Sequence, residues 1–376
     1  MRVVHVITKL ELGGAQQNTL YTVSHLDRAR FEPHLVCGSG GILDDEARAL
    51  KDVAVHFASS LEREIRPLSD YQAFQELKDL FLKLQPDIVH THSSKAGVLG
   101  RMAASSAGVP VIIHTYHGFG FHKFQNSIVF QMYVAAEKSA SRHATHLIFV
   151  SEANWKWARE LGVVGECSAS LIRSGVMIHP LINVKKDPAV KRELSGTDEC
   201  QLVGMIACLK PQKDPLIFVE AADRVTQKIP AARFVLIGEG ELHDSVVKRI
   251  AEMRHPDRFL LAGWRRDIPN VLANLDLAVL TSLWEGLPRV IPEATISGVP
   301  MIASDIDGNR EVIFAGQNGA LAKPQNADDF AEKIIQALTE NWHVAPEIAK
   351  RIQDEFDIDK MVTAQQELYL NLKESA

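Results

Sequence analysis

The chain has 376 residues, of which 46% are hydrophobic and 23% charged, with a formal net charge of −6, as in an ordinary soluble globular protein of two domains. No apolar run approaches the roughly 20 residues that a membrane-spanning helix needs, and no run of Lys and Arg indicates nucleic-acid binding. Residues 1–8 resemble a strand rather than a signal peptide, and the four cysteines show no CxxC or metal-ligand spacing. We therefore expect a cytoplasmic protein with reduced thiols.

Short apolar runs alternate with amphipathic segments of helical length in the first half of the chain. This alternation is typical of a parallel β-sheet built from βαβ units. Helical patterns lie between the strands, for example at 72–84 and 94–107. The expected strands are 2–8, 33–37, 53–57, 87–91, 110–114 and 145–150.

The same alternation starts again after a polar, turn-rich segment at 184–198 that has the composition of a linker. We therefore expect an α/β protein with two Rossmann-like domains, 1–186 and 187–358, that face each other across a cleft. The expected elements of the second half are strands at 201–207, 233–237, 258–262, 276–280 and 300–303, and helices at 326–339, 345–354 and 359–374.

The two halves differ in charge. Residues 1–190 carry 20 Lys and Arg against 18 Asp and Glu, a net charge of +2, whereas residues 191–376 carry 21 against 29, a net charge of −8. A mildly basic first half fits a surface that faces phosphates or an anionic lipid leaflet. Chance variation in surface charge explains it equally well.

Glycines and histidines follow the expected strands of the first domain. Gly13 and Gly14 come after the first strand, where paired glycines and a helix start can admit an anion. His92 and Lys95 follow the fourth strand, and His117 follows the fifth, directly before a glycine. Imidazole at a strand's carboxyl end can donate to a sugar hydroxyl or a phosphate. A satisfied structural histidine and a zinc site are the alternatives; without a helical i, i+4 pair or a nearby Cys or Glu, we expect no metal.

In the second domain, lysines and glycines follow the expected strands. Lys210 and Lys213 follow the strand at 201–207, and Gly238 follows the strand at 233–237. Ordinary turn chemistry between a strand and a helix explains the glycine as well as a role in ligand binding does.

Two carboxylates, Glu285 and Glu293, lie eight residues apart around the turn that follows the buried run 275–280. Pro292 marks the expected start of the next helix and Gly298 its end. Ligands bind at the carboxyl ends of strands in an open α/β sheet, and a carboxylate can accept hydrogen bonds from vicinal sugar hydroxyls.

This Glu-x7-Glu pattern, together with the glycine loop, His117-Gly118 and the Lys213 loop, resembles the retaining glycosyltransferases of family 4. The resemblance covers essentially the whole chain. It implies the GT-B fold, with the last helix, 359–376, packed back on the first domain. It also implies that a sugar moves from a nucleoside diphosphate donor, most often a UDP-sugar, without a metal or other cofactor.

The resemblance also implies roles for individual residues. His117 and Glu285 would act at the reacting sugar, and Glu293 would hold the ribose. The other donor-binding residues would be Gly14, Lys210, Lys213, Gly238, Gly286, Leu287 and Arg289.

The sequence departs from the family pattern at two positions. Cys208 stands where the family has an arginine that grips the diphosphate, so either Lys210 or Arg289 is expected to supply that charge. Pro288 stands where the family has a glycine, and proline has no backbone N–H to donate.

The acceptor is expected on the side of the first domain, near His92, Lys95, Phe119 and His122. The aromatic and basic residues at 118–133 fit a lipid-linked saccharide at the inner face of the cell membrane, or equally a helix packed on its own sheet. The expected activity is therefore sugar transfer in polysaccharide or glycan assembly. The alternatives are a non-hydrolysing UDP-sugar epimerase of the same fold and a weakened nucleotide-sugar-binding protein.

Overall fold

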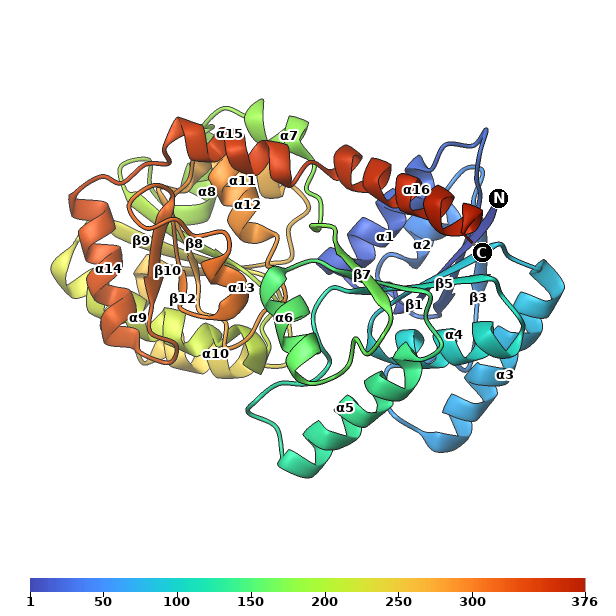
Figure 1. Cartoon of the computed structure of the whole chain (residues 1–376). Coiled ribbons are helices and arrows are strands. Elements are labelled where there is room, and N and C mark those ends of the chain that lie inside the picture. Colours follow the sequence, from blue (N-terminus) through green and yellow to red (C-terminus); the bar gives the residue numbers. More distant parts are fainter. Residues whose placement is uncertain (376) are drawn as a thin grey trace. The chain divides into compact units, whose positions relative to one another are not determined.

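The computed structural model describes residues 1–375 and divides into two compact units. Unit 1 contains Met1–Gly175 together with the C-terminal helix that begins at Ile358, and unit 2 contains Val176–Asp357. Each unit is an α/β domain around one parallel sheet (Figure 1). No helix within residues 1–375 is both long and apolar enough to span a bilayer.

Unit 1 has a seven-stranded sheet in the order β3-β2-β1-β4-β5-β6-β7, and all its strand pairs are parallel. Its strands are β1 (Arg2–Lys9), β2 (Glu32–Gly38), β3 (Ala54–Phe57), β4 (Ile88–His92), β5 (Val111–Tyr116), β6 (His146–Phe149) and β7 (Ser168–Leu171). Its helices are α1 (Gly14–His25), α2 (Asp44–Arg48), α3 (Pro67–Leu84), α4 (Ser94–Ser106), α5 (Ser127–Ser141), α6 (Glu152–Glu160) and α16 (Ile358–Glu374).

Unit 2 has a six-stranded parallel sheet in the order β10-β9-β8-β11-β12-β13. Its strands are β8 (Gln201–Ile206), β9 (Ala232–Ile237), β10 (Phe259–Gly263), β11 (Leu277–Leu280), β12 (Met301–Ser304) and β13 (Gly319–Ala322). Its helices are α7 (Ile178–Ile182), α8 (Pro188–Ser195), η1 (Pro211–Lys213), α9 (Pro215–Lys228), α10 (His243–Ala251), η2 (Pro256–Arg258), α11 (Ile268–Asn274), α12 (Val290–Ile296), α13 (Asp307–Arg310), α14 (Ala327–Thr339) and α15 (Pro346–Glu355).

The strand order reverses once in each sheet. The reversal lies between β1 and β4 in unit 1, and between β8 and β11 in unit 2. Loops that leave neighbouring strands at a reversal turn away from each other, which opens a crevice at the carboxyl ends of those strands. These two places are therefore where each unit can bind a ligand.

The two faces of the unit 1 sheet are covered by different helices (Figure 1). On one face Leu26 and residues of α16, including Met361 and Tyr369, pack on Val3 and Ile88. Helices α3 and α4 cover the other face. The last helix therefore belongs to the core of unit 1, in agreement with the expected packing of 359–376 on the first domain.

The boundary between the units differs from the expected one at 186/187. Unit 2 already begins at Val176, which forms a bridge with Asp357, and α7 and α8 pack on α11 and α12. The polar segment at 184–198 therefore lies inside unit 2, because α8 buries Leu194 under its polar surface.

All eleven expected strands agree with the structure, and two strands observed within residues 1–375 were not predicted. The unpredicted ones are β7 and β13, which lie at the edges of their sheets and consist of Ser, Ala, Gly and Leu. Helix α12 begins at Val290, so Pro292 lies in its first turn, where the missing N–H costs no helical hydrogen bond. Gly298 follows the helix with a φ of 77°, as a helix-ending glycine should.

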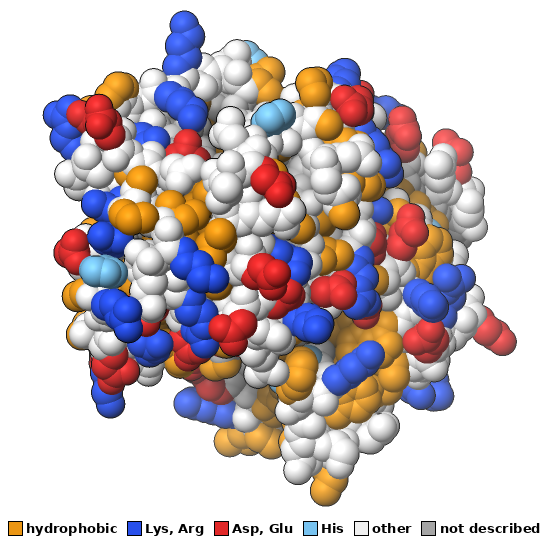
Figure 2. All heavy atoms as spheres, turned by 90° about the vertical axis from the view of Figure 1, so that its left-hand side faces the viewer, with side chains coloured by type: hydrophobic (Ala, Val, Ile, Leu, Met, Phe, Trp, Pro, Cys, Tyr) orange, Lys and Arg blue, Asp and Glu red, His pale blue; other side chains and the backbone are white. Residues whose placement is uncertain are grey.

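Charged side chains on the face drawn in Figure 2 are of both signs. Lys and Arg are interspersed with Asp and Glu there, and neither sign covers the face. Residues 191–376 carry a net charge of −8, but this face shows no single large acidic area.

One ion pair lies entirely inside unit 1. The Arg101 side chain is fully buried, and its Nη2 lies 2.6 Å from Oε2 of Glu137. Tyr116 donates its hydroxyl hydrogen to the same carboxylate at 2.8 Å, and Arg101 Nε donates to the carbonyl of Gly97 at 2.7 Å. This network ties α4 and α5 to β5.

Replacing Glu137 by Ala should destabilise unit 1 by about 3–5 kcal/mol, because it leaves the guanidinium of Arg101 buried without its counter-charge. Urea unfolding followed by circular dichroism measures the change. The matched control is Asp45→Ala, which breaks the exposed pair of Asp45 with Arg48 and should cost less than about 1 kcal/mol. Equal effects of the two substitutions would contradict the importance of the buried pair.

Candidate functional site

The loops that leave β8 and β11 meet at the strand reversal of unit 2. Lys213 follows β8, Glu285 follows β11, and their ammonium and carboxylate form an ion pair. Ser282 donates its hydroxyl hydrogen to Oε1 of Glu285 at 2.6 Å. The side chain of Glu285 is only 7% exposed, so these two contacts fix the direction of its carboxylate.

Further hydrogen bonds join the same two loops. The side chain of Gln212 donates to the carbonyl of Trp284 at 2.9 Å, and the backbone N–H of Leu283 donates to the carbonyl of Gln212 at 2.8 Å. The hydroxyl of Thr281 lies 2.8 Å from the carbonyl of Lys213. The position of Glu285 relative to Lys213 is therefore set by backbone contacts as well as by their charges.

Glu293 lies in the first turn of α12 and pairs with the guanidinium of Arg289, whose Nη2 is 3.0 Å from Oε1. Burial raises the pKa of Glu293, and the positive charge of Arg289 opposes this rise. Both expected carboxylates thus lie beside a cation at the carboxyl end of β11, with oxygens able to accept hydrogen bonds from hydroxyl groups.

Glycine is required at two turns near these carboxylates. A Cβ on Gly238, whose φ is 138°, would lie 2.0 Å from the carbonyl oxygen of Ala207. A Cβ on Gly308 would lie 2.5 Å from the carbonyl oxygen of Gly286. The backbone therefore packs tightly on both sides of the reversal, with Gly286 held against the loop after β12 and the neighbouring Leu287 side chain buried.

Cys208, Lys210 and Lys213 lie on one short loop after β8. The N–H of Lys210 donates to the carbonyl of Cys208 at 2.9 Å, and the N–H of Lys213 donates to the carbonyl of Lys210 at 2.9 Å. This loop brings two lysines into consecutive turns. Arg289, the other expected substitute for the missing arginine, binds Glu293 instead.

In unit 1, His117 lies just after β5, next to the reversal between β1 and β4. Its Nε2 is 3.1 Å from Nδ1 of His92, and His92 Nε2 is 3.0 Å from Nδ1 of His5. Burial lowers the pKa of His117 to about 4. Its Nδ1 is shielded from solvent and has no hydrogen-bond partner among the described residues.

His92 and Lys95 were expected to face the acceptor, but both are engaged within unit 1. Both ring nitrogens of His92 are hydrogen-bonded to other histidines, and the ring is buried. The ammonium of Lys95 pairs with Asp70 of α3 and donates to the carbonyl of Glu64. Gly14 is the first residue of α1, at the carboxyl end of β1 as expected.

The aromatic residues after His117 are mostly internal. Phe119 stacks against Tyr116, Phe121 and Trp157, with ring centroids about 5 Å apart, and Phe121 is only 2% exposed. They form part of the hydrophobic cluster around β5 and β6. Of the two interpretations of 118–133, packing against the unit's own elements describes Phe121, which is buried, and in part Phe119, which is partly buried. His122 lies beside Phe124, and burial lowers its pKa.

Several residues that shape the site were not predicted. They are Thr281, Ser282, His5 and Tyr369. Ser282 directly precedes the Glu285 turn and could have been singled out from that position. His5 and Tyr369 lie 364 residues apart in sequence, and nothing local indicates that they meet.

Comparisons with known proteins give the family. Residues 12–176 match the family described as Glycosyltransferase Family 4, and residues 189–355 match that described as Glycosyl transferases group 1. A protein of Escherichia coli is 33% identical and covers 99% of this chain and 97% of its own length; it is named UDP-Gal:alpha-D-GlcNAc-diphosphoundecaprenol alpha-1,3-galactosyltransferase. The chain belongs to glycosyltransferase family 4.

A second relative of this family comes from Campylobacter jejuni. It is N,N'-diacetylbacillosaminyl-diphospho-undecaprenol alpha-1,3-N-acetylgalactosaminyltransferase, 28% identical, with 81% of this chain and 82% of its own covered. Among solved structures, Anabaena HepE in complex with UDP and glucose has a TM-score of 0.83 and 21% identity over 99% of this chain and all of its own. That likeness confirms the GT-B fold.

The relatives are named as transferases, so the chain is a glycosyltransferase. The epimerase and the weakened binding protein, which the sequence left as alternatives, are not supported. The comparisons do not test the roles of the individual site residues. Those roles remain predictions that rest on the geometry described above.

The raised pKa of Asp214, next to Lys213, predicts that the stability of the fold depends on pH. Burial and repulsion from Glu220 raise its pKa from 3.8 to about 6. The folded state therefore binds this proton more tightly than the unfolded chain, and the resulting stabilisation is present below about pH 4 and is lost as the pH rises through 6. Asp214→Asn should lessen that loss by about 1 to 3 kcal/mol between pH 4 and pH 7.

Urea unfolding at a series of pH values measures this effect. Asp214 has a φ of 43°, so the control is Asp52→Asn, at an exposed residue with a similar φ of 58°. That control separates the charge effect from the preference of Asn for left-handed backbone. Parallel stability curves for wild type and Asp214→Asn would show that the carboxyl group titrates alike in both states.

Proposed function

We propose that this enzyme transfers a hexose, galactose or its N-acetylamino form, from a UDP-sugar to a polyprenyl-diphosphate-linked saccharide, with retention of the α configuration. The observation that carries the proposal is the buried cluster of Lys213, Glu285 and Ser282 at the strand reversal of unit 2. It combines a cation for a diphosphate with an oriented carboxylate for sugar hydroxyls.

The donor would bind to unit 2 through these groups. Glu285 would accept hydrogen bonds from hydroxyls of the transferred sugar, and Glu293, beside Arg289, would accept them from the ribose. Lys213, with Lys210 one turn earlier on the same loop, would face the diphosphate. A cation there stabilises the negative charge that develops on the leaving diphosphate more than the charge of the bound donor.

The reaction exchanges one bond at the anomeric carbon for another. The bond from C1 to the diphosphate oxygen breaks, and a bond from C1 to the acceptor oxygen forms on the same face. The acceptor hydroxyl gives its proton to the departing diphosphate oxygen, so no side-chain nucleophile is consumed. Lys213 would neutralise the leaving group, while His117 and Glu285 would orient the sugar.

The relatives support the proposed acceptor class. The two enzymes above are named for acceptors on diphosphoundecaprenol and for alpha-1,3 linkages. An enzyme for such an acceptor must work at a membrane surface, since the polyprenyl chain stays in the bilayer.

The start of α5 offers unit 1 a surface for that contact. Phe124, Ile128 and Met132 are 62%, 70% and 67% exposed, and residues 128 and 132 are one turn apart on the same side of the helix. We propose that these apolar side chains, with Lys123 beside them, enter the headgroup region of an anionic leaflet.

Glu285→Gln should lower kcat/KM for sugar transfer about 10- to 100-fold, because an amide replaces the charge that Lys213 and the sugar hydroxyls need. The assay measures UDP release with UDP-galactose or UDP-N-acetylgalactosamine and a polyprenyl-diphosphate saccharide, and NMR reads the anomer of the product. The control is Glu252→Gln at an exposed end of α10. Unchanged kinetics of Glu285→Gln, or a β-linked product, would contradict the proposed site or mechanism.

Phe124→Ser, Ile128→Ser and Met132→Ser should each weaken binding to vesicles of phosphatidylglycerol and phosphatidylethanolamine about tenfold, since each removes one apolar side chain from the interface. Vesicle sedimentation measures the binding. Val247→Ser, at a 46% exposed position on α10 of unit 2, is the control. If the variants bind vesicles as well as wild type does, the membrane surface lies elsewhere.

A further inference from the structure

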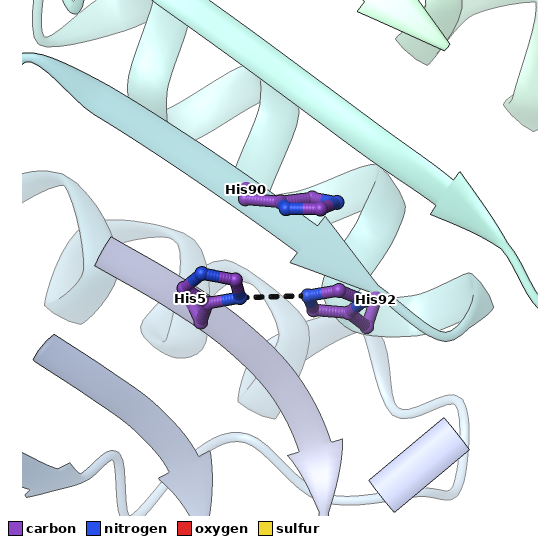
Figure 3. Close-up of side chains that lie close together, drawn as sticks. All are labelled: His5, His90 and His92. Atoms are coloured by element: carbon purple, nitrogen blue, oxygen red, sulfur yellow. Dashed lines mark hydrogen bonds between the residues drawn. The ribbon is translucent and has the colours of Figure 1, made fainter. Parts of the chain in front are cut away.

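A chain of buried hydrogen bonds runs beneath α16 and ends at His117. Figure 3 shows its centre, where His5 of β1 and His92 of β4 are joined by a hydrogen bond and His90 lies above them. His5 and His90 are register partners on neighbouring parallel strands, so their side chains point to the same face of the sheet. That is the face on which Tyr369 of α16 packs.

Every link of this chain is within hydrogen-bond distance. Starting from the core, Thr115 Oγ1 lies 2.7 Å from Nε2 of His90, and His90 Nδ1 lies 2.6 Å from the Tyr369 hydroxyl. That hydroxyl lies 3.3 Å from Nε2 of His5. His5 Nδ1 reaches His92 at 3.0 Å, and His92 reaches Nε2 of His117 at 3.1 Å.

Each histidine in the chain is a neutral ring with one N–H. Burial lowers the pKa of His5 to about 3 and of His117 to about 4, and it lowers the pKa of His90 and His92 well below the usual value. A neutral ring donates from one nitrogen and accepts at the other. Because the Tyr369 hydroxyl also lies 3.4 Å from Oε1 of Gln365, three arrangements satisfy the chain. In one of them Tyr369 accepts from both His90 and His5 and donates to Gln365, over a distance longer than the roughly 2.5–3.0 Å of a normal O–H···O bond. In the other two, Tyr369 donates to one histidine and accepts from the other, so the direction of one bond fixes the direction of all the others.

The two arrangements in which Tyr369 donates to a histidine differ at the ends. If the bonds run toward the site, Thr115 donates to His90, and the last proton lies on Nδ1 of His117. If they run the other way, Nδ1 of His117 is a bare acceptor, and the hydroxyl of Thr115 must donate elsewhere. Thr115 is 3% exposed, and His90 is its one side-chain partner among residues 1–375. The reverse arrangement would therefore bury an O–H without an acceptor, which costs about 1–3 kcal/mol.

The same three histidines, His5, His90 and His92, have nitrogens within 4.8 Å of one another and so could in principle hold a metal ion. All six of their ring nitrogens already lie at hydrogen-bond distance from a partner. A metal would need three of these lone pairs, and it would have to break the chain at its centre. The geometry favours a hydrogen-bonded chain over a metal site.

We propose that Tyr369, His5 and His92 are positioning residues that hold His117 as a neutral ring with its proton on Nδ1, so that it donates a hydrogen bond to a substrate oxygen. The role at the substrate rests on the proposed function, whereas the position of the proton does not. His117 thus donates a hydrogen bond to a sugar hydroxyl or a phosphate oxygen and does not act as a base. The last helix of the chain takes part in the site through Tyr369.

The experiment reads the tautomer of His117 directly. Long-range ¹H–¹⁵N NMR on protein labelled at histidine nitrogens, with His117→Gln to assign the signal, should show the Nδ1–H form in the wild type. Tyr369→Phe and Thr115→Val each remove one hydroxyl from the chain and should give a mixture of the two tautomers. They should also lower kcat for transfer about three- to tenfold, with little change in the KM for the donor.

Two controls match these variants. Tyr21→Phe removes another tyrosine hydroxyl that contacts α16, since Tyr21 donates to Asp359 at 2.6 Å outside the chain. Thr115→Ser keeps the hydroxyl. Both should leave the tautomer and kcat as in the wild type.

Three results would overturn the proposal. They are an Nε2–H signal for His117 in the wild type, a tautomer that stays unchanged in both Tyr369→Phe and Thr115→Val, and stoichiometric zinc in the purified protein that is lost in His5→Asn. The tautomer is measured without substrate, so these results are independent of the donor and acceptor. A protein with the expected tautomers but no sugar transfer would contradict the proposed function alone.

Discussion

The reversal of strand order in each parallel sheet is the constraint on which the sites of this protein depend. At β8 and β11 it brings Lys213 and Glu285 together although they lie 72 residues apart, and at β1 and β4 it brings His5 to His92 across 87 residues. Lys213 and Glu285 follow the ends of their strands, whereas His5 lies within β1 and His92 ends β4. All four strands have a neighbouring strand on each side in the sheet. The sheets therefore hold the backbone positions of the site residues fixed.

The two units solve the problem of burying polar groups in opposite ways. In unit 2 the carboxylates of Glu285 and Glu293 each have a cation as partner, which offsets much of the cost of removing a charge from water. In unit 1 the histidines at the reversal are neutral and satisfy one another. Unit 2 is thus suited to a charged ligand such as a nucleoside diphosphate, and unit 1 offers directed hydrogen bonds without a net charge.

Local patterns predicted most of the fold and the positions of the site loops. Apolar runs located eleven strands. Glu285, Lys213 and His117 lie in the loops that follow strands, and Glu293 lies in the first turn of the next helix, as expected. Strands β7 and β13 were missed because edge strands of Ser, Ala and Gly carry little hydrophobic signal. The ring contacts of Phe119 and the partners of His92 and Lys95 were missed because they depend on tertiary contacts that no local pattern encodes.

The two departures from the family pattern lie in the two loops that meet at the strand reversal of unit 2. Pro288 lies two residues before the start of α12, and its carbonyl accepts from the N–H of Ile291 at 3.3 Å. Cys208 lies at the head of a loop whose backbone bonds place Lys210 and Lys213 in successive turns. A loop with two lysines can meet a diphosphate with point charges, although without the bidentate geometry of arginine. Arg289 pairs with Glu293 as Lys213 pairs with Glu285, so each of the two carboxylates of unit 2 has a cation beside it.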